Sequence, residues 1–188
     1  MKIKRTNEIE DNSFVVGDVI SFTLTDGEEV EAMAVEKTDQ GTMFILVDCL
    51  KQECPWNKKD TTEGGYAASY IRKMLNTKIL DRFPEEIRNR MVPIEGDLLS
   101  LPYAKEIFGD DVRFAADDPE DIRQWDCMKE RRNRIAWRGC RSGELEWYWL
   151  RSVFSATCAC GVTTTGNANH AGSSNAIGVR PRFLLADL

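Results

Sequence analysis

The stretch that decides the fold is Trp-Tyr-Trp-Leu-Arg-Ser at residues 147–152, together with Gly-Val-Arg-Pro at residues 178–181. The aromatic residues of the first stretch favour a β-strand, and no helical period runs through either one. The glycine of the second stretch indicates a close backbone approach or a bulge, and its proline indicates a strand end or an edge. We therefore expect the segments around Leu150 and Val179 to pack in one small sheet, with the connection between them facing water.

Each of these stretches contains an arginine, Arg151 in the first and Arg180 in the second. A guanidinium group offers five hydrogen-bond donors, so both side chains are expected to hold loops by donating to backbone carbonyls. Strand motifs more often fix a fold than carry chemistry, and these residues are therefore interpreted as scaffold.

The residues between and after the two stretches predict a strand, a loop and a last strand. Residues 157–165 are small, β-branched and cysteine-containing, which suits a tightly packed strand. Residues 166–175 are rich in Gly, Asn, Ser and Ala, which predicts a loop. Residues 177–185 form the expected last strand.

Residues 14–50 predict a β-meander. Polar and apolar residues alternate from Val19 to Thr25, as in a half-buried strand. Asp26-Gly27 is typical of a hairpin turn, and residues 30–37 then return as the second strand. The third strand, at residues 43–47, is apolar on both sides, so we expect it to be covered on both faces.

The central part of the chain predicts several helices. Ser69 is a suitable N-cap for the first, which carries an apolar stripe. Pro84 is suited to the first turn of the second helix. A third is expected at residues 102–108, and Asp118-Pro119 predicts the start of a fourth.

With these elements in place, the chain resembles an uncharacterised domain family of bacteria and their prophages. The most specific shared features are Trp-Leu-Arg-Ser at residues 149–152 and Gly-Val-Arg-Pro at residues 178–181. Residues 70–76 resemble the helix of that family that ends in Leu-Asn, and residues 83–87 resemble the segment after it. Residues 98–101 resemble the family's strand before a short helix, so the resemblance covers most of the chain.

The same ending is similar to that of C-type-lectin-like folds, a group that includes formylglycine-generating enzymes and the variable proteins diversified by retroelements. This resemblance implies that the first and last strands lie side by side and that a long loop region presents the ligand surface. The expected fold class is α+β, C-type-lectin-like, with an N-terminal β-meander, central helices, C-terminal strands and long loops. The family has no established activity, so the resemblance implies fold more than function.

Length and charge narrow the possible functions. The 188 residues predict a tail at residues 1–13 and a single domain at residues 14–188. The net charge of -6 argues against nucleic acid and against an anionic membrane as partners. No apolar run approaches the ~20 residues of a membrane span, and no signal peptide is apparent. These features predict a cytoplasmic location, or a phage particle if a prophage encodes the chain.

Neither the cysteines nor the charged clusters predict a metal site or a cofactor. Cys158 and Cys160 have one residue between them and a single histidine, His170, nearby, which is unlike the spacing of zinc ligands. We interpret them as small buried thiols, reduced in the expected compartment. The acidic run at residues 110–121 lacks the spacing of a calcium loop. The basic run at residues 129–141 is interpreted as a solvated or salt-bridged face.

The candidate ligand-binding residues are the aromatic pair that opens the decisive stretch and the polar side chains of the loop after it. Small polar loops on a rigid strand frame resemble evolved binding surfaces. An ordinary flexible hairpin loop is the alternative interpretation. The candidates are Trp147, Tyr148, Asn167, Asn169, His170, Ser173 and Asn175.

These observations and the resemblance lead us to expect a non-catalytic ligand-binding or display module, associated with a prophage and similar to the variable proteins that retroelements diversify. Its ligand would be a protein or a glycan, held by loops between residues 139 and 175. Two alternatives remain open. One is an enzyme of the formylglycine-generating type that uses Cys158 or Cys160, and the other is a structural phage component that forms homo-oligomers.

Overall fold

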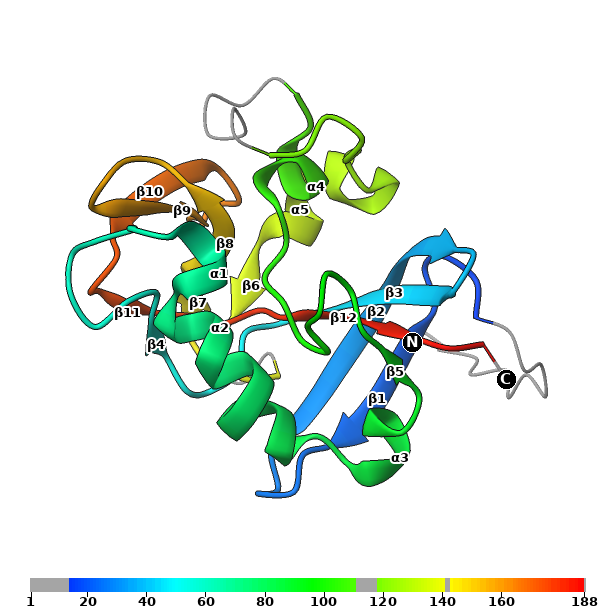
Figure 1. Ribbon diagram of the computed structural model, residues 1–188. Helices are drawn as coiled ribbons and strands as arrows, with labels where there is room; N and C mark the ends of the chain where they lie inside the picture. The colour runs from blue at the N-terminus through cyan, green and yellow to red at the C-terminus, as the bar shows by residue number, and fades with distance from the viewer. Residues whose placement is uncertain (1–13, 111–117, 141–142, 188) are drawn as a thin grey trace.

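A computed structural model describes residues 14–110, 118–140 and 143–187 (Figure 1). The chain is an α+β protein in which strands pair mostly antiparallel and the helices are short, as the sequence predicted at that level. The tail expected at residues 1–13 lies outside the described residues.

The larger sheet contains five strands in the order β1, β2, β3, β12 and β5. Its first three strands are the predicted meander: β1 (Val19–Thr23), β2 (Glu29–Thr38) and β3 (Gly41–Leu46). All six residues of β3 are buried, because β2 and β12 (Arg182–Leu185) flank it and side chains cover both of its faces. The short strand β5 (Met91–Val92) pairs with the far edge of β12. The last strand therefore lies beside β3 and β5, and β1 does not pair with it.

A second sheet contains β10, β9 and β8 in that order. The predicted strands at residues 147–152 and 157–165 correspond to β8 (Tyr148–Val153) and β9 (Cys158–Val162). The expectation of a loop across residues 166–175 was wrong, because β10 (Ala168–Gly172) occupies its middle. Each residue of β10 pairs with one of β9, from Ala168 opposite Val162 to Gly172 opposite Cys158. That pairing binds the backbone of a stretch whose polar composition is typical of a loop.

Two short ribbons connect the sheets. One pairs β4 (Cys54–Pro55) with β11 (Ala176–Ile177), and the other pairs β6 (Ala136–Trp137) with β7 (Leu145–Glu146). The predicted last strand is thus divided into β11 and β12.

The expectation that the Leu150 and Val179 segments share one sheet was only partly right. The two segments do meet, through a single parallel bridge between Tyr148 and Gly178. Around it the Trp149 amide donates to the Gly178 carbonyl at 3.2 Å, and the Gly178 amide donates to the Trp147 carbonyl at 2.8 Å. The chain then passes to β12 in the other sheet, so the decisive motifs join two sheets instead of building one.

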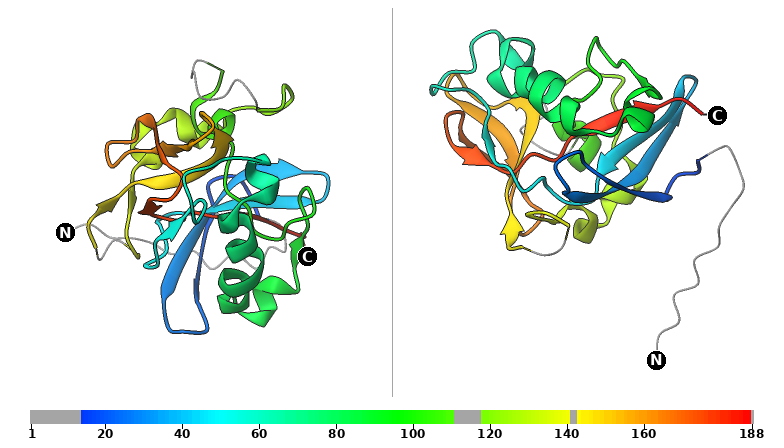
Figure 2. Two further views of the ribbon diagram at one scale, coloured as in Figure 1. Left: turned by 60° about the vertical axis from the view of Figure 1, so that its left-hand side comes forward. Right: turned by 90° about the horizontal axis from the view of Figure 1, so that it is seen from below.

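Four helical segments follow one another along the chain between the sheets, with Ser69 in extended conformation between the first two; we call them the helical run. It comprises α1 (Gly65–Ala68), α2 (Tyr70–Met74), a π-helical turn (Leu75–Ile79) and a 3-10 turn (Leu80–Arg82). The predicted N-cap is confirmed, since the Ser69 Oγ accepts from the Arg72 amide at 3.2 Å. In the right view of Figure 2 the run lies between the strands of the smaller sheet and those of the larger one. A short helix follows Pro84 as expected, α3 (Glu85–Arg88).

The later helices differ from the prediction in one respect. The helix expected at residues 102–108 is present as α4 (Ala104–Phe108). No helix begins at Asp118-Pro119, where the described residues form turns before a 3-10 turn (Asp126–Lys129) and α5 (Arg131–Arg134). The Asp118 carboxylate accepts instead from the Lys105 amide at 2.9 Å and from the Ser152 hydroxyl at 2.6 Å. Asp118 therefore accepts a hydrogen bond from the first turn of α4 instead of capping a helix of its own. A local capping pattern does not reveal such a distant partner.

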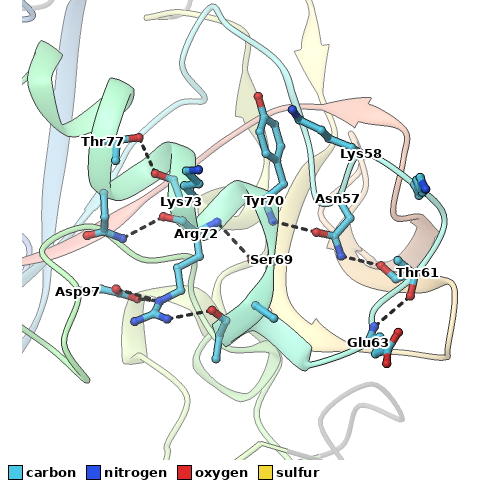
Figure 3. A pocket seen from close by; sticks show the side chains of 14 residues that line it. Asn57, Lys58, Thr61, Glu63, Ser69, Tyr70, Arg72, Lys73, Thr77 and Asp97 are labelled. Carbon is cyan, nitrogen blue, oxygen red and sulfur yellow. Dashed lines mark hydrogen bonds and ion pairs between the residues drawn. The ribbon is translucent and has the colours of Figure 1, made fainter.

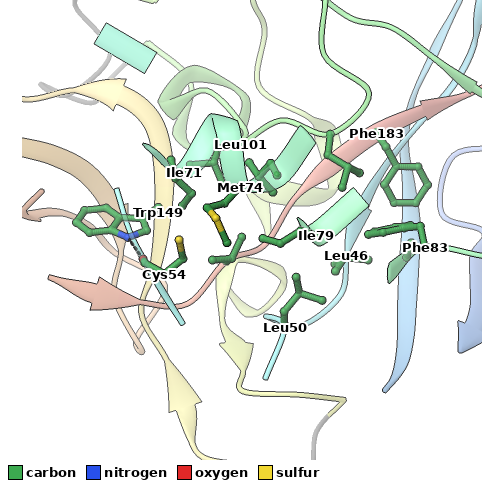
Figure 4. Close-up of a cluster of buried hydrophobic side chains, with 14 of the residues drawn as sticks. Leu46, Leu50, Cys54, Ile71, Met74, Ile79, Phe83, Leu101, Trp149 and Phe183 are labelled. Carbon is green, nitrogen blue, oxygen red and sulfur yellow. Dashed lines mark hydrogen bonds between the residues drawn. The ribbon is translucent and has the colours of Figure 1, made fainter. Parts of the chain in front are cut away.

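The core has two parts, one on each face of the larger sheet. Figure 4 shows part of the first, where side chains of the helical run meet those of β3, β8 and β12. Phe44 stacks on Phe183 with ring centroids 5.8 Å apart, and Phe83 packs edge-on against Phe183 at 5.7 Å. Burial of such rings is the main term that stabilises a fold of this size.

Candidate functional site

A groove of about 830 Å³ lies beside α1 and α2 (Figure 3). Its walls are the loop at residues 57–63, the exposed side of the helical run as far as Thr77, and Asp97. We call this surface the helix groove. A cavity of this size falls within the ~300–1,000 Å³ range of sites that take small ligands.

Two tryptophans fasten the start of the groove loop to the smaller sheet. The Trp56 indole Nε1 donates to the Leu150 carbonyl at 3.1 Å, and the Trp149 Nε1 donates to the Cys54 carbonyl at 2.9 Å. Both tryptophans are fully buried. A buried indole needs a partner for its N–H. Each ring here finds one within two residues of the other tryptophan, Trp56 at Leu150 and Trp149 at Cys54. The loop therefore leaves from a fixed point.

The C-terminal third of the chain holds the rest of the groove loop from behind. The Ser173 hydroxyl lies 3.1 Å from the carbonyls of both Lys59 and Thr61, and the Ser173 carbonyl accepts from the Asn57 amide at 2.8 Å. The Ser174 hydroxyl donates to the Asp60 carboxylate at 2.7 Å. That bond and a second one from the Ser174 amide lower the pKa of Asp60. A loop bound at this many points is preorganised.

Within the groove, Asn57 joins the loop to the helix. Its Nδ2 donates to the Thr61 carbonyl at 2.6 Å, and its Oδ1 accepts from the Tyr70 amide at 2.8 Å. This places the Tyr70 ring beside the loop, where the Lys58 Nζ lies 4.8 Å from the ring centroid. Tyr70 and Lys58 thus place an aromatic ring and a cation side by side in the wall of the groove (Figure 3).

The charges of the groove are unbalanced. The Arg72 Nε donates to both oxygens of Asp97, at 2.9 and 2.7 Å, and this contact raises the pKa of Arg72. These two charges neutralise each other. The remaining charged side chains of the wall are Lys58, Lys59, Lys73 and Glu63, and none of them forms an ion pair with a described residue. The groove is thus locally cationic on a chain of net charge -6.

Two of the residues predicted to bind ligand are buried. Tyr148 is fully buried on β8, and its hydroxyl donates to the Arg134 carbonyl at 2.9 Å. Ser173 is also fully buried, since it supports the groove loop as described. Trp147, beside Tyr148, is half-buried. Tyr148 and Ser173 therefore do not belong to the surface that a ligand can reach, because their polar groups satisfy the backbone of other segments.

The other four predicted residues are accessible, but they do not gather in one place. Asn167 lies in the turn before β10, where its backbone amide donates to the Thr163 hydroxyl at 3.1 Å. Asn175 lies beyond the opposite end of β10, and both asparagines are exposed. Asn169 and His170, on β10 itself, are half-buried. Asn167 and Asn175 therefore lie beyond opposite ends of β10, with Asn169 and His170 between them.

The cysteines and the histidine form no metal centre in the described part of the chain. Cys160 is buried and Cys158 is half-buried, and the His170 ring stacks on Phe154 with centroids 3.8 Å apart. Burial raises the pKa of the Cys49 thiol and raises that of Cys54 to about 11. Three members of the charged runs, Asp111, Asp117 and Arg141, lie outside the described residues.

The scaffold role predicted for the arginines agrees with the contacts of Arg180. Its Nε donates to the Leu46 carbonyl at 2.7 Å, and its Nη1 donates to the Asn133 carbonyl at 3.1 Å. Arg151 differs, because its guanidinium lies over two rings, 4.6 Å from the Tyr66 centroid and 4.1 Å from the Tyr103 centroid, and pairs with Glu95 at 2.6 Å. Arg151 is therefore held by rings and a carboxylate instead of by carbonyls.

Sequence reasoning missed the residues that line the helix groove. Lys58, Lys59 and Tyr70 lie in or next to a stretch that shows only as a polar loop followed by a helix. The available signal was an Asn-Lys-Lys run placed between a buried tryptophan and a helix N-cap, which is a loop on a rigid frame. Its partners, Ser173 and Ser174, are more than a hundred residues away.

Comparison with known proteins gives one match. A family described as a domain of unknown function, DUF6273, matches residues 40–187. No curated protein and no solved structure matches the chain. Among the helices that the structure describes, none has both the length and the apolar character to cross a bilayer.

Proposed function

Because the chain belongs to the DUF6273 family of domains of unknown function, we propose a function from its geometry, namely a non-catalytic ligand-binding module that holds an acidic glycan in the helix groove. The observation that carries this proposal is a groove of about 830 Å³ whose loop is fixed from behind by the C-terminal third of the chain. Because the loop is already ordered, little binding free energy is lost in ordering it when the ligand binds.

The lining of the groove supports a sugar ligand. Tyr70 offers a ring against which the apolar face of a sugar can pack, and Thr61 and Thr77 supply hydroxyl groups at the wall. Lys58 and Lys73 supply donors that carry a positive charge. Charge-assisted hydrogen bonds to a carboxylate or sulfate are stronger than neutral ones, so an acidic sugar is favoured over a neutral one.

This proposal moves the expected ligand surface. The loops between residues 139 and 175 were expected to touch the ligand, whereas we now assign them a supporting role, since Ser173 and Ser174 hold the groove loop. A C-type-lectin-like relationship and a prophage origin remain part of the proposal. They rest on the paired motifs at residues 149–152 and 178–181.

An array that carries neutral and acidic glycans tests the proposal. The wild-type protein is expected to bind acidic glycans, and Tyr70→Ala and Lys73→Ala to lose about tenfold in affinity each. Lys78→Ala is the matched control, because Lys78 is an exposed lysine of the same helical run and does not line the groove. It should bind like the wild type.

Three results would contradict the proposal. One is binding that is equal in Tyr70→Ala and wild type, and another is binding confined to neutral glycans. The third is a bound glycan that is recovered with a covalent change after incubation, since that would make the module an enzyme. Binding of a protein instead of any glycan would replace the ligand class that we propose.

A further inference from the structure

A second concave site lies on the meander. It is on the face opposite to the one that packs against the helical run. It is a pocket of about 470 Å³ between β1, β2, the end of β3 and the segment at residues 132–137. We call it the β2–β6 pocket. The Cys49 amide donates to the Trp137 carbonyl at 2.9 Å, which fixes β6 alongside the chain that leaves β3. The pocket is therefore built between two parts of the molecule that are fastened to each other.

Most of the wall of this pocket is apolar. Val19 and Met33 contribute from β1 and β2, and Ile135 and Trp137 contribute from the facing segment. Val19 and Trp137 are among the large apolar side chains that are exposed, Trp137 at 37%. An apolar rim that stays in contact with water favours a ligand with an apolar body.

Arg180 lines the same pocket although only 1% of the residue is exposed. Its Nε and Nη1 are occupied by Leu46, Asn133 and the Tyr148 hydroxyl. Its Nη2 makes no hydrogen bond to a described residue. This nitrogen is therefore the part of the fixed guanidinium that can still donate to a ligand, although the residue as a whole is 1% exposed.

Glu31 supplies the opposite charge from β2. Its backbone carbonyl accepts from the Val47 amide at 2.8 Å, so its position in the wall is fixed. The second acid of the pocket, Asp48, is already engaged, since its Oδ1 accepts from the Trp137 amide at 3.0 Å. Glu31 forms no ion pair with any residue in the described ranges. Arg132 also lines the pocket, is exposed and forms no ion pair with a described residue, so the pocket offers two cations, Arg132 and Arg180, and one available anion, Glu31, beside an apolar wall.

We propose that the β2–β6 pocket binds an apolar α-amino acid in its zwitterionic form, with the carboxylate at Arg180, the ammonium at Glu31 and the side chain against Trp137. A volume of about 470 Å³ admits a ligand of this size. Each charged group of the ligand meets an opposite charge, so neither Arg180 nor Glu31 is left without a partner when water is displaced. This site is separate from the helix groove and does not depend on the glycan proposal.

Titration with L-phenylalanine, followed by nuclear magnetic resonance at the indole Nε1 of Trp137, tests this site. Two analogues each lack one charge: 3-phenylpropionate has no ammonium, and phenethylamine has no carboxylate. We expect saturable binding of L-phenylalanine, and binding at least tenfold weaker for both analogues. No saturable shift at about 10 mM L-phenylalanine, or equal affinity for all three compounds, would overturn the proposal.

Variants separate the charges of the site from its shape. Glu31→Gln should bind L-phenylalanine and 3-phenylpropionate with similar affinity, because the group that selects the ammonium is gone. A preference that survives this change contradicts the role of Glu31. Arg180 is left intact in this test, because it also holds three structural partners.

The apolar wall has a matched control on the same ribbon. Trp137→Ala should lose at least tenfold in affinity for L-phenylalanine, followed at the backbone amides. Leu145→Ala should bind like the wild type, since Leu145 is Trp137's partner across the β6–β7 ribbon, is 42% exposed and does not line the pocket. Equal losses in the two variants would contradict the site. Tyr70→Ala should leave this affinity unchanged, which distinguishes failure here from failure at the helix groove.

Discussion

Glu106 and Arg182 form a buried ion pair between α4 and β12, with 3% of each side chain exposed. Arg182 also donates from its Nε to the Ser100 hydroxyl at 3.0 Å, and Glu106 accepts from the Tyr103 amide at 2.8 Å. Every charge-bearing group in this pair therefore has a partner. Such a pair costs desolvation energy, and it is tolerated because additional hydrogen bonds complete it.

We predict that, above pH 7 where Glu106 is ionised, Glu106→Ala lowers the free energy of unfolding by about 3–5 kcal/mol, because the change leaves the buried Arg182 guanidinium without its carboxylate. Urea unfolding followed by circular dichroism measures this. Arg123→Ala is the matched variant, because the Arg123 side chain is exposed and bonds only to nearby carbonyls. It should change the free energy of unfolding by less than about 0.5 kcal/mol. A loss of similar size in both would contradict the account of the pair.

The same carboxyl predicts how stability depends on pH. Burial raises the pKa of Glu106 from 4.5 to about 7, against the opposing effect of Arg182. The folded state therefore holds this proton more tightly than the unfolded state does. The contribution of Glu106 is most favourable below about pH 4.5 and is lost as the pH rises through 7.

Urea unfolding at intervals from pH 4.5 to 7.5 measures this contribution in wild type and in Glu106→Gln. The difference between the two should change steadily across that window, with the wild type losing stability relative to the variant as the pH rises. Parallel curves would show that Glu106 keeps the same charge in both states.

Thiol reactivity should follow burial. Cys54 is buried, and burial raises its pKa to about 11, while Cys158 is half-buried at the end of β9. In the native protein a thiol reagent is expected to modify Cys158 well before Cys54, because the thiolate is the reactive species and must be reached. Mass spectrometry of partly labelled protein gives the order. Labelling of Cys54 first would contradict the packing at β4.

At the scale of elements, Gly178 determines whether β8 and the closing segment can meet. A Cβ at this position would lie 2.6 Å from the Trp147 carbonyl oxygen and 2.8 Å from the Cys49 Sγ. This is the close approach that the glycine of the second motif indicated. The backbone of Gly178 can therefore pair with β8 only while the residue has no side chain.

We predict that Gly178→Ala lowers the free energy of unfolding by about 2–3 kcal/mol through overpacking. Gly172→Ala is a milder control, because the nearest atom to its Cβ would be an oxygen of the exposed Asp60 side chain, at 3.1 Å. Thermal unfolding of the two variants compares them. If Gly178→Ala is as stable as Gly172→Ala, the bridge between the two motifs is not tightly packed.

The elements that could be predicted are those whose signals are local. The meander follows from alternation and from the turn at Asp26-Gly27, in which Gly27 has φ 87°. Ser69 caps its helix as its position predicted. By contrast, β10 is a strand because β9 lies beside it, and Asp118 serves α4 instead of a helix of its own. Both outcomes depend on partners that the local sequence does not reveal.

At the scale of the whole molecule, the helix groove arises from segments far apart in the chain. Residues 57–63 form its loop, and Ser173 and Ser174 hold that loop in place. Sequence reasoning found the second segment and assigned it to the ligand surface. It could not show that the polar side chain of Ser173 faces inward, because that depends on a contact across more than a hundred residues.

The same scale explains why a chain of net charge -6 can take an acidic ligand. Three lysines line the groove against one unpaired acid, Glu63, while Asp97 is neutralised by Arg72. The lysines are Lys58, Lys59 and Lys73. The charges that line a site determine the binding energy of a ligand in contact with them, whereas net charge acts on the ligand at long range. Salt weakens both interactions. Binding at the groove should therefore weaken by more than about twofold when the salt concentration rises from 0.05 M to 0.5 M, which calorimetry measures. Unchanged affinity would argue against lysine contacts.

The most direct test of the helix groove is to map where an acidic sugar binds. Titration of isotope-labelled protein with an oligogalacturonate, followed by nuclear magnetic resonance, would locate the contact residue by residue. We predict saturable shifts at Lys58, Tyr70 and Lys73, with smaller ones at Ser173 behind the loop. Shifts that gather instead at Asn167 and Asn169, or that are absent from residues 57–77, would contradict the assignment of this groove as the ligand site.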